Sequence, residues 1–450
     1  MNFLSLAFVG FVTLTFVVYW NLPRRLRVGF LALASVFYYG AYSPAFLAHF
    51  LAVIGLNFVI ASALAKNRSR SLVALGVGLN LLHLGFFKYF NSLFVLLLPG
   101  AAAESSFRVI MPLAISFYTF QFIAFQVDCY RGQVSKVEPL RFTLFMLFFP
   151  HLISGPILRS GDLYSAIGNE TESREMQTRG LYLIGLGLFK KLLIADVIGY
   201  LVNPVFKSPA EYGAIDTFAA ILGYTVQLYC DFSGFIDIAR GISKLFGYDM
   251  PVNFRSPYFA ASFSEFWTRW HITLSKFIRD YIYIPLGGNR VSPARQYFNL
   301  MLAMVLSGLW HGETLNFLLW GALHGIYLAG EKLMGLAKEP ANRGTWLLRN
   351  LWVVGGWAFS LVFFRAADFP SALTLLRQLA SVQPSSLNLA LIFALIVLAW
   401  LVQYAEARRE TLLSLALPRA AYLLPLVLIV IYVIIIRIQI PNEAFIYVQF

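Results

Sequence analysis

Long apolar runs recur along the whole sequence and are separated by short polar connections. The clearest runs of membrane-spanning length cover residues 3–20, 46–65, 181–201, 351–364, 388–404 and 421–436. Because a bilayer span needs about 20 apolar residues, the pattern predicts roughly eleven to thirteen membrane helices. No polar stretch is long enough to form a second domain, and no internal repeat is visible. We therefore expect one membrane-embedded domain over residues 1–450.

Residues 231–289 interrupt this pattern, because aromatic residues there alternate with charged ones. Its second half includes the ionisable side chains of Arg269, His271, Lys276, Arg279 and Asp280. A lipid-facing helix does not carry so many charges cheaply, so we expect this segment at the interface or along a water-filled cavity. Lys276 and Asp280, four residues apart, could partly neutralise each other. The sequence PLGGNR that follows predicts a turn in which Gly287 and Gly288 supply positive φ.

The segment GLWHGETLNFLLWGALHG, residues 308–325, holds two histidines inside an otherwise apolar stretch. His311 and His324 are each followed by glycine and lie 13 residues apart. On one uninterrupted helix they would be about 20 Å apart and rotated by about 220°. Residues 312–316, GETLN, offer a break, so the sequence predicts two helices here.

The composition agrees with a membrane protein. Hydrophobic residues make up 59% of the chain and charged residues only 13%, which is about half the charged fraction of a soluble domain. The first apolar run has no basic residue before Arg24 and no A-x-A-like cleavage site, so we interpret it as a retained helix and not a signal peptide. The predicted fold is an all-α, polytopic integral membrane protein.

The net charge of +13 is explained by basic loops and not by nucleic-acid binding. Basic residues follow alternate apolar runs, at Arg24, Arg25 and Arg27, at Lys66, Arg68 and Arg70, and at Arg131, Lys136 and Arg141. The connections near 42–46 and 93–107 carry almost none. Since cytoplasmic loops carry an excess of Lys and Arg, we expect the loops near 25, 68 and 135 in the cytoplasm and the N-terminus outside.

Familiar catalytic and metal-binding motifs are missing from the sequence. Cys129 and Cys230 lie in no C-x-x-C spacing and are expected to be buried apolar residues. There is no phosphate-binding loop, no H-E-x-x-H zinc helix and no G-x-S-x-G nucleophile elbow, and no metal site is predicted. What remains is general-base chemistry by histidine in an intramembrane cavity, which suits acyl transfer from a thioester.

The six histidines are not equivalent candidates for that base. His49 and His83 lie in apolar helices without polar neighbours in the sequence and are expected to be hydrogen-bonded core residues. A structural role is also the leading interpretation for His151. His271 and His311 each follow a tryptophan at the edge of a polar break. Imidazole exchanges a proton near neutral pH, so these two are the candidate catalytic residues.

Two blocks, FSEFWTRWHITLSKFIRDYIYIPLGGNR (263–290) and LSGLWHGETLNFLLWGALHG (306–325), resemble the membrane-bound O-acyltransferase family (MBOAT). The chain looks like the bacterial branch that contains the membrane subunit of alginate O-acetyltransferase, with the D-alanyl transfer protein of teichoic acid synthesis as a more distant relative. Further matching motifs cover most of the chain. They are FFKYFN (86–91), MPLAISFYTFQ (111–121), FFPHLISGPILR (148–159), GLFKKLLIAD (187–196), YCDFSGFIDIARG (229–241), NFRSPY (253–258), FFRAADF (363–369) and the terminal FIYVQF.

The resemblance implies that His311, in W-H-G, is the catalytic base or the acyl relay, with His271, in R-W-H, in support. It implies re-entrant or interfacial helices around a central tunnel, in the bacterial cytoplasmic membrane. The expected donor is acetyl-CoA or another acyl-CoA from the cytoplasm, with no bound cofactor. The expected partners are the bilayer, an SGNH-like periplasmic or surface acetyltransferase and an exported polysaccharide.

The resemblance and the local sequence together suggest the rest of the site. The residues expected to line the tunnel or contact substrates are Trp267, Arg269, Trp270, Ser275, Arg279, Asp280, Asp231, Ser233, Trp310, Asn316 and His324. Arg269 and Arg279 would meet the phosphates of CoA, although interfacial arginines that fix helix depth explain them equally well. His324 is expected to support His311 as a packing residue.

Three positions depart from the family pattern. Cys230 stands where an aromatic residue is common, Ile236 where serine is usual, and Arg240 where a small residue is usual. They bear on fine specificity and not on the fold. Two alternatives stay open: an O-acyltransferase whose acceptor is peptidoglycan, a teichoic acid or a protein, and a transporter or flippase that uses buried charges as a relay.

Overall fold

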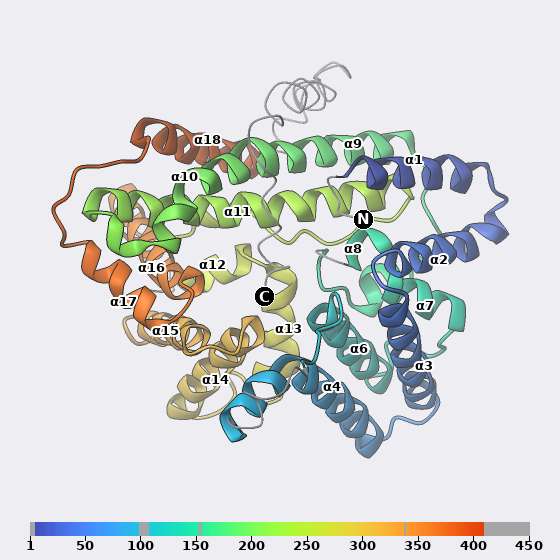
Figure 1. Ribbon diagram of the computed structural model, residues 1–450. Helices are drawn as coiled ribbons and strands as arrows, with labels where there is room; N and C mark the ends of the chain where they lie inside the picture. The colour runs from blue at the N-terminus through green and yellow to red at the C-terminus, as the bar shows by residue number, and fades with distance from the viewer. Residues whose placement is uncertain (1–4, 99–107, 153–154, 337–338, 409–450) are drawn as a thin grey trace. The chain divides into compact units, whose positions relative to one another are not determined.

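The computed structural model describes residues 5–98, 108–152, 155–336 and 339–408, and within these ranges it contains helices and no strands (Figure 1). The all-α prediction is confirmed. The apolar run predicted at 421–436 and the terminal FIYVQF motif lie outside the described residues. The chain divides into two compact units, Met1–Ile184 with Ala239–Pro251, and Gly185–Ile238 with Val252–Phe450.

The first unit is built mainly from the N-terminal helices. They are α1 (Leu6–Asn21), α2 (Arg24–Gly40), α3 (Pro44–Lys66), α4 (Arg70–Leu97), α6 (Ile115–Tyr130), α7 (Pro139–Leu147), α8 (Phe149–Leu152) and the π-helix η1 (Ser160–Tyr164). Serine caps begin three of them, because the side chains of Ser5, Ser43 and Ser69 each accept a hydrogen bond from the backbone N–H three residues on. Both α3 and α4 pack against α6 (Figure 1).

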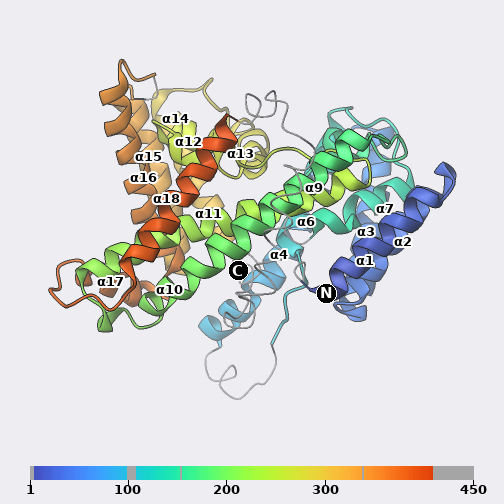
Figure 2. The same ribbon diagram turned by 90° about the horizontal axis from the view of Figure 1, so that it is seen from above.

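The second unit holds the motifs of the predicted site. Its elements are the π-helix η2 (Phe189–Ala195), α10 (Asp196–Lys207), η3 (Pro209–Glu211), η4 (Pro257–Phe259), α12 (Phe263–Arg269), α13 (Ile272–Ile278), the π-helix η5 (Arg279–Tyr283), α14 (Pro293–His311), α15 (Leu315–Leu333), α16 (Arg343–Arg365), α17 (Phe369–Gln378) and α18 (Leu389–Ala407). Two further helices, α9 (Arg174–Leu188) and α11 (Ala214–Leu245), contribute residues to both units. Within the second unit α14 packs on α15, and α15 on α16 (Figure 2).

Four helices in the described part of the chain are long and apolar enough to cross a membrane: α3, α4, α16 and α18. The shorter apolar helix α1 corresponds to the run predicted at 3–20. The runs predicted at 46–65, 351–364 and 388–404 coincide with α3, α16 and α18. The run predicted at 181–201 is divided among α9, η2 and α10.

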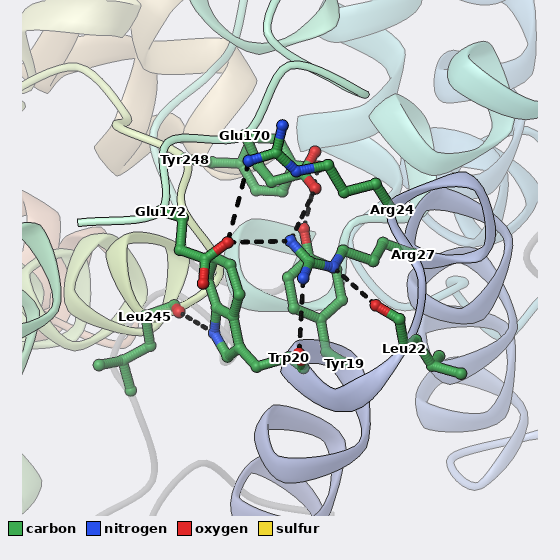
Figure 3. Close-up of polar contacts among 9 residues, drawn as sticks. All are labelled: Tyr19, Trp20, Leu22, Arg24, Arg27, Glu170, Glu172, Leu245 and Tyr248. Carbon is green, nitrogen blue, oxygen red and sulfur yellow. Dashed lines mark hydrogen bonds and ion pairs between the residues drawn. The ribbon is translucent and has the colours of Figure 1, made fainter. Parts of the chain in front are cut away.

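Arg27 ties the first two helices to the loop before α9 (Figure 3). Its guanidinium lies 3.2 Å from the Glu170 carboxylate and 3.7 Å from that of Glu172, and its Nε donates to the Leu22 carbonyl at 3.1 Å. The Trp20 ring covers it, with the guanidinium carbon 4.7 Å from the ring centroid. Only 7% of the Arg27 side chain is exposed. A buried charge persists only with partners, so Arg27 is a structural cation and not an ordinary loop charge.

Glycine pairs let α9 and α11 approach closely. In the first unit a Cβ atom at Gly180 would lie 2.7 Å from the Gly241 oxygen. In the second unit a Cβ atom at Gly187 would lie 2.4 Å from the Gly234 oxygen. Small residues at such crossings are a common packing device of membrane helices. The glycines of the YCDFSGFIDIARG motif therefore serve helix packing.

Lys190 is buried in the π-helix η2, at the centre of a charged group in the second unit. Its Nζ lies 2.7 Å from the Asp237 carboxylate and also pairs with Glu406 of α18. The Tyr229 hydroxyl donates to Glu406 at 2.6 Å. The ion pairs join η2, α11 and α18, which are distant in the sequence.

Candidate functional site

The segment 308–325 forms the junction between α14 and α15. The predicted break is confirmed, because α14 ends at His311 and α15 begins at Leu315. Between them Gly312 is extended, with φ −170° and ψ 169°. His311 is therefore the last residue of its helix, as the GETLN sequence predicts.

Glycines also hold the α14–α15 hairpin together. A Cβ atom at Gly308 would lie 2.2 Å from the Phe317 oxygen, and one at Gly321 would lie 2.5 Å from the Met304 oxygen. The two helices cross so closely at these points that any side chain would collide with backbone. Gly308 and Gly321 are therefore required for the packing of α14 on α15 beside His311.

His311 lies among aromatic rings. The ring centroids of Trp310, Trp320 and Phe364 are 4.6, 5.1 and 5.2 Å from its own. The residue is only 4% exposed. Phe364 belongs to the FFRAADF motif at the end of α16, so two motifs far apart in the sequence meet at this imidazole.

His324 occupies the next turns of α15 and has a defined tautomer. Its Nε2 lies 3.0 Å from Oγ of Ser360, and that hydroxyl donates to the Trp357 carbonyl at 2.7 Å. A hydroxyl has one hydrogen, so Ser360 accepts its second bond from Nε2–H, and the lone pair of His324 is on Nδ1. Within the described ranges Nδ1 is buried and has no hydrogen-bond partner.

His271 stands before α13 with φ +41°, in the left-handed region that non-glycine residues rarely adopt. Two backbone hydrogen bonds hold this turn. Ile272 N donates to the Asn253 carbonyl at 3.0 Å, and Arg255 N donates to the Arg269 carbonyl at 2.9 Å. These two bonds pair the NFRSPY motif with the R-W-H motif. Backbone strain such as the positive φ of His271 is often found at functional sites.

Trp310 is the common neighbour of the two histidines predicted to be catalytic. Its ring centroid lies 4.6 Å from that of His311 and 6.3 Å from that of His271. Phe232 of α11 also contacts His271, at 4.8 Å between centroids. The R-W-H and W-H-G histidines thus meet at one buried aromatic ring.

Three more tryptophans surround this group. Trp267 and Trp357 lie 5.2 and 5.4 Å from His324, and Trp270 packs on Trp357 at 4.7 Å. In the described part of the chain the indole N–H groups of Trp267, Trp320 and Trp357 are buried without an acceptor. Buried donors are normally satisfied, so three unpaired indole N–H groups within one aromatic cluster are an unusual feature of this part of the chain.

The loop 252–262 before α12 is held by two buried amides that the sequence gives little reason to single out. Asn350 of α16 donates through Nδ2 to the carbonyls of Tyr258 and Ala260, at 2.8 and 2.9 Å. Gln403 of α18 accepts from Tyr258 N at 3.1 Å. The one available signal is that each is the only amide side chain in its helix.

Glu331 of α15 caps α12 from outside the helix. Its carboxylate accepts hydrogen bonds from the backbone N–H groups of Phe263 and Ser264, the latter at 3.0 Å. These N–H groups belong to the first turn of α12, which lacks acceptors within its own helix. The bond therefore fixes the helix that carries Trp267 against the helix that carries His324.

The two arginines predicted to meet CoA phosphates each have a carboxylate neighbour. Nη2 of Arg269 lies 2.5 Å from Oε1 of Glu265, and Nε of Arg279 lies 2.6 Å from Oδ1 of Asp280. The spacing of the sequence predicts Lys276 as the partner of Asp280, whereas the structure pairs Asp280 with Arg279. Arg279 is the more accessible cation, with 58% of its side chain exposed against 32% for Arg269.

Asp231 and Ser233, the two predicted site residues on α11, are both buried. The Asp231 carboxylate lies 2.7 Å from Nζ of Lys191, which also pairs with Asp196 at 2.7 Å. This ion pair gives Asp231 a structural contact that the sequence does not reveal.

Ser275 and Asn316 make local contacts with the backbone. Ser275 Oγ donates to the Trp270 carbonyl at 3.2 Å. Asn316 Nδ2 donates to the Ala366 carbonyl at 3.1 Å and so joins the start of α15 to the end of α16. Both residues support elements that carry aromatic side chains of the site.

The other three histidines lie in the first unit. Nε2 of His49 and Nε2 of His83 are 2.9 Å apart, and their rings stack at 5.1 Å. His151 Nε2 lies 3.2 Å from Oε1 of Gln121. His49 and His83 are hydrogen-bonded as expected, but each is the partner of the other, and the sequence conceals this pairing because the two lie 34 positions apart.

Cys129 and Cys230 are buried free thiols, as predicted. In the described ranges no group of three or more His, Cys, Asp or Glu side chains could hold a metal ion. The groups of the second unit that could transfer a proton or hydrogen-bond a substrate are its imidazoles, its indoles and its charged pairs.

The sequence profile described as MBOAT, membrane-bound O-acyltransferase family, matches residues 105–369. The chain is 37% identical over 406 residues to the probable alginate O-acetylase AlgI of Pseudomonas putida, covering 86% of this chain and 82% of that protein. It is 34% identical over 425 residues to the peptidoglycan O-acetyltransferase of Helicobacter pylori, covering 86% and 79%. It is also 32% identical over 245 residues to the teichoic acid D-alanyltransferase of Streptococcus thermophilus, covering 51% and 59%.

Proposed function

Because this chain belongs to the membrane-bound O-acyltransferase family, we propose that it moves an acetyl group from cytoplasmic acetyl-CoA to an exported polysaccharide. His311 is the base of this reaction and His271 supports it. The observation that carries the proposal is the contact of both imidazoles with the buried ring of Trp310.

The proposed reaction needs a base and a dry enclosure. His311 takes the proton of the acceptor hydroxyl while the hydroxyl oxygen attacks the thioester carbonyl. The new C–O bond forms, the C–S bond breaks, and the CoA thiolate leaves and receives the proton from His311. The aromatic walls exclude water, which protects the acyl group from hydrolysis and strengthens polar interactions in the site.

Donor binding is proposed to use the polar groups at hand. The indole N–H groups of Trp267, Trp320 and Trp357 would donate to the carbonyl groups of the acyl-pantetheine arm. Arg279 is the better candidate for the CoA phosphates because it is exposed, whereas Arg269 is more enclosed beside Glu265. The alternating basic loops support cytoplasmic entry, with the N-terminus outside.

The acceptor is proposed from the relatives. The Pseudomonas putida relative is named a probable alginate O-acetylase, which supports an exported polysaccharide as the acceptor. A bacterial cytoplasmic membrane setting and an SGNH-like acetyltransferase partner are part of the same proposal and follow from the family resemblance. Peptidoglycan is the second candidate, since the Helicobacter pylori relative aligns over an equal share of this chain.

The decisive experiment uses the full chain in proteoliposomes with radiolabelled acetyl-CoA. Alginate-type polysaccharide and peptidoglycan fragments are offered in parallel, with and without an SGNH-like partner. We expect acetylation with wild type and a loss of about 100-fold or more with His311→Ala, because that change removes a general base. His49→Ala, which removes an imidazole outside the site, is the matched control.

Full activity of a folded His311→Ala protein would contradict the assigned base. Movement of acetyl-CoA or polymer across the bilayer without acyl turnover would favour a transporter. Labelling of peptidoglycan fragments alone would replace the polysaccharide acceptor and leave the chemistry unchanged.

A further inference from the structure

We propose that Asn253 is a positioning residue that fixes His271 as the tautomer with its proton on Nε2. In the acyl transfer proposed above, on which this role rests, His271 then acts as a hydrogen-bond donor and leaves proton abstraction to His311. The inference follows from three hydrogen bonds around one buried amide.

The orientation of the Asn253 amide is set by Thr273. Oδ1 of Asn253 lies 3.0 Å from the backbone nitrogen of Thr273 and 2.9 Å from its hydroxyl. A backbone N–H group only donates, so the amide atom that faces it must be the carbonyl oxygen. The other end of the amide, the NH₂ group, is therefore the end that faces His271.

The amide orientation in turn fixes the imidazole. Nδ2 of Asn253 lies 3.3 Å from Nδ1 of His271. An amide nitrogen has no lone pair to offer, so it donates and Nδ1 must accept. A neutral imidazole carries one proton, which must then be on Nε2. A charged ring, with hydrogen on both nitrogens, would set two donors against each other at this contact.

The surrounding backbone holds this arrangement in place. The Asn253 carbonyl accepts from Ile272 N at 3.0 Å, so Asn253 contacts His271's turn through both its backbone and its side chain. Phe232 and Trp310 pack on the imidazole at 4.8 and 6.3 Å between centroids. The left-handed conformation of His271, with φ +41°, is thus kept by contacts on several sides.

A fixed N–H donor has a defined use in the proposed reaction. When the acceptor oxygen attacks the thioester carbonyl, negative charge develops on the carbonyl oxygen. A donor held in advance stabilises that charge without reorganisation. His271 gains and loses no proton in this role. The single proton transferred goes from the acceptor hydroxyl to His311 and then to the departing thiolate.

The test is Asn253→Asp in the full chain. A carboxylate only accepts, so a neutral His271 must then carry its proton on Nδ1, and its lone pair moves to Nε2. In ring-¹⁵N-histidine spectra, with the His271 signals assigned by their loss in His271→Gln, we expect unprotonated Nδ1 and protonated Nε2 in wild type. We expect the reverse in Asn253→Asp, with kcat reduced about 100-fold and KM for acetyl-CoA little changed.

Asn350→Asp is the matched control, because Asn350 of α16 is also a buried asparagine that contacts this loop, but it donates to the backbone carbonyls of Tyr258 and Ala260 and makes no hydrogen bond to His271. It should lower the yield of folded protein without changing the His271 tautomer. If Asn253→Asp fails to fold, the protonation of Nδ1 and Nε2 in the wild-type spectrum tests the tautomer assignment on its own.

Protonated Nδ1 in wild type would overturn the proposal, and so would wild-type kcat in Asn253→Asp with a reversed tautomer. The expected tautomer in a wild-type protein that does not use acetyl-CoA would instead refute the proposed function and leave the tautomer assignment standing.

Discussion

The ring of Phe317 fills the space beside Gly312 so closely that a Cβ atom there would lie 2.1 Å from Cε2 of the ring. The same ring packs on Phe364 at 5.2 Å between centroids, and Phe364 packs on His311. The extended backbone of Gly312 could be adopted by any residue. A glycine is therefore needed in W-H-G because the Phe317 ring leaves no room for a side chain.

We expect Gly312→Ala to lower acyl transfer at least about tenfold and to destabilise the fold by about 1–3 kcal/mol, because the added methyl group must displace Phe317. Gly330→Ala in α15 is the control, since its Cβ atom would meet only the end of Met334 at 3.8 Å. That change should stabilise the helix by about 0.5–1 kcal/mol. Acyl-transfer assays and thermal unfolding in nanodiscs measure both effects, and equal activity of the two variants would contradict the steric argument.

His324 should behave as a support and not as a second base. Ser360→Ala removes the acceptor of its Nε2–H and leaves a buried donor unpaired, which costs about 1–3 kcal/mol. We expect a lower unfolding temperature and a fall in kcat that is much smaller than the fall for His311→Ala. The exposed Ser165→Ala, in the first unit, serves as the control. A loss in Ser360→Ala as large as that of His311→Ala would give His324 a direct part in the chemistry.

The features that the sequence predicts well are those fixed by neighbouring residues. The break at GETLN and the positive φ of Gly287 and Gly288, at +106° and +52°, depend on local backbone preferences. The apolar runs that become α3 and α16 depend on composition within one segment. Each of these features can be predicted without knowing which distant segments pack against it.

The features that the sequence conceals are pairings between distant segments. From its position in the sequence, Arg27 is predicted to be one of the loop cations. In the structure it pairs with Glu170, which lies 143 positions away. The Asn253 amide and the Ser360 hydroxyl set two imidazole tautomers through contacts that only the folded chain creates. A lone polar residue in an apolar segment signals that a partner exists but not which residue it is.

The crossing of α9 and α11 gives a packing prediction. Gly234→Ala would place its Cβ atom 2.7 Å from the Gly187 oxygen, which is backbone and cannot move aside. Gly78→Ala in α4 is the matched control, because nothing lies within 4 Å of its Cβ position. We expect Gly234→Ala to lower the unfolding temperature in nanodiscs and Gly78→Ala to leave it unchanged or raise it. The reverse order would show that the close approach is not required.

The buried pairs of Lys190 give the largest expected change in stability. Lys190→Met removes the amine that lies between Asp237 and Glu406, and loss of one partner from a buried ion pair costs about 3–5 kcal/mol. Adding Glu406→Gln should recover part of that cost, because it removes one of the two facing carboxylates. The exposed Lys207→Met should change the free energy of unfolding by less than about 0.5 kcal/mol. Unfolding titrations in mixed micelles measure all three proteins. A Lys190→Met protein as stable as wild type, or a double variant less stable than the single one, would mean that these ion pairs do not hold η2, α11 and α18 together.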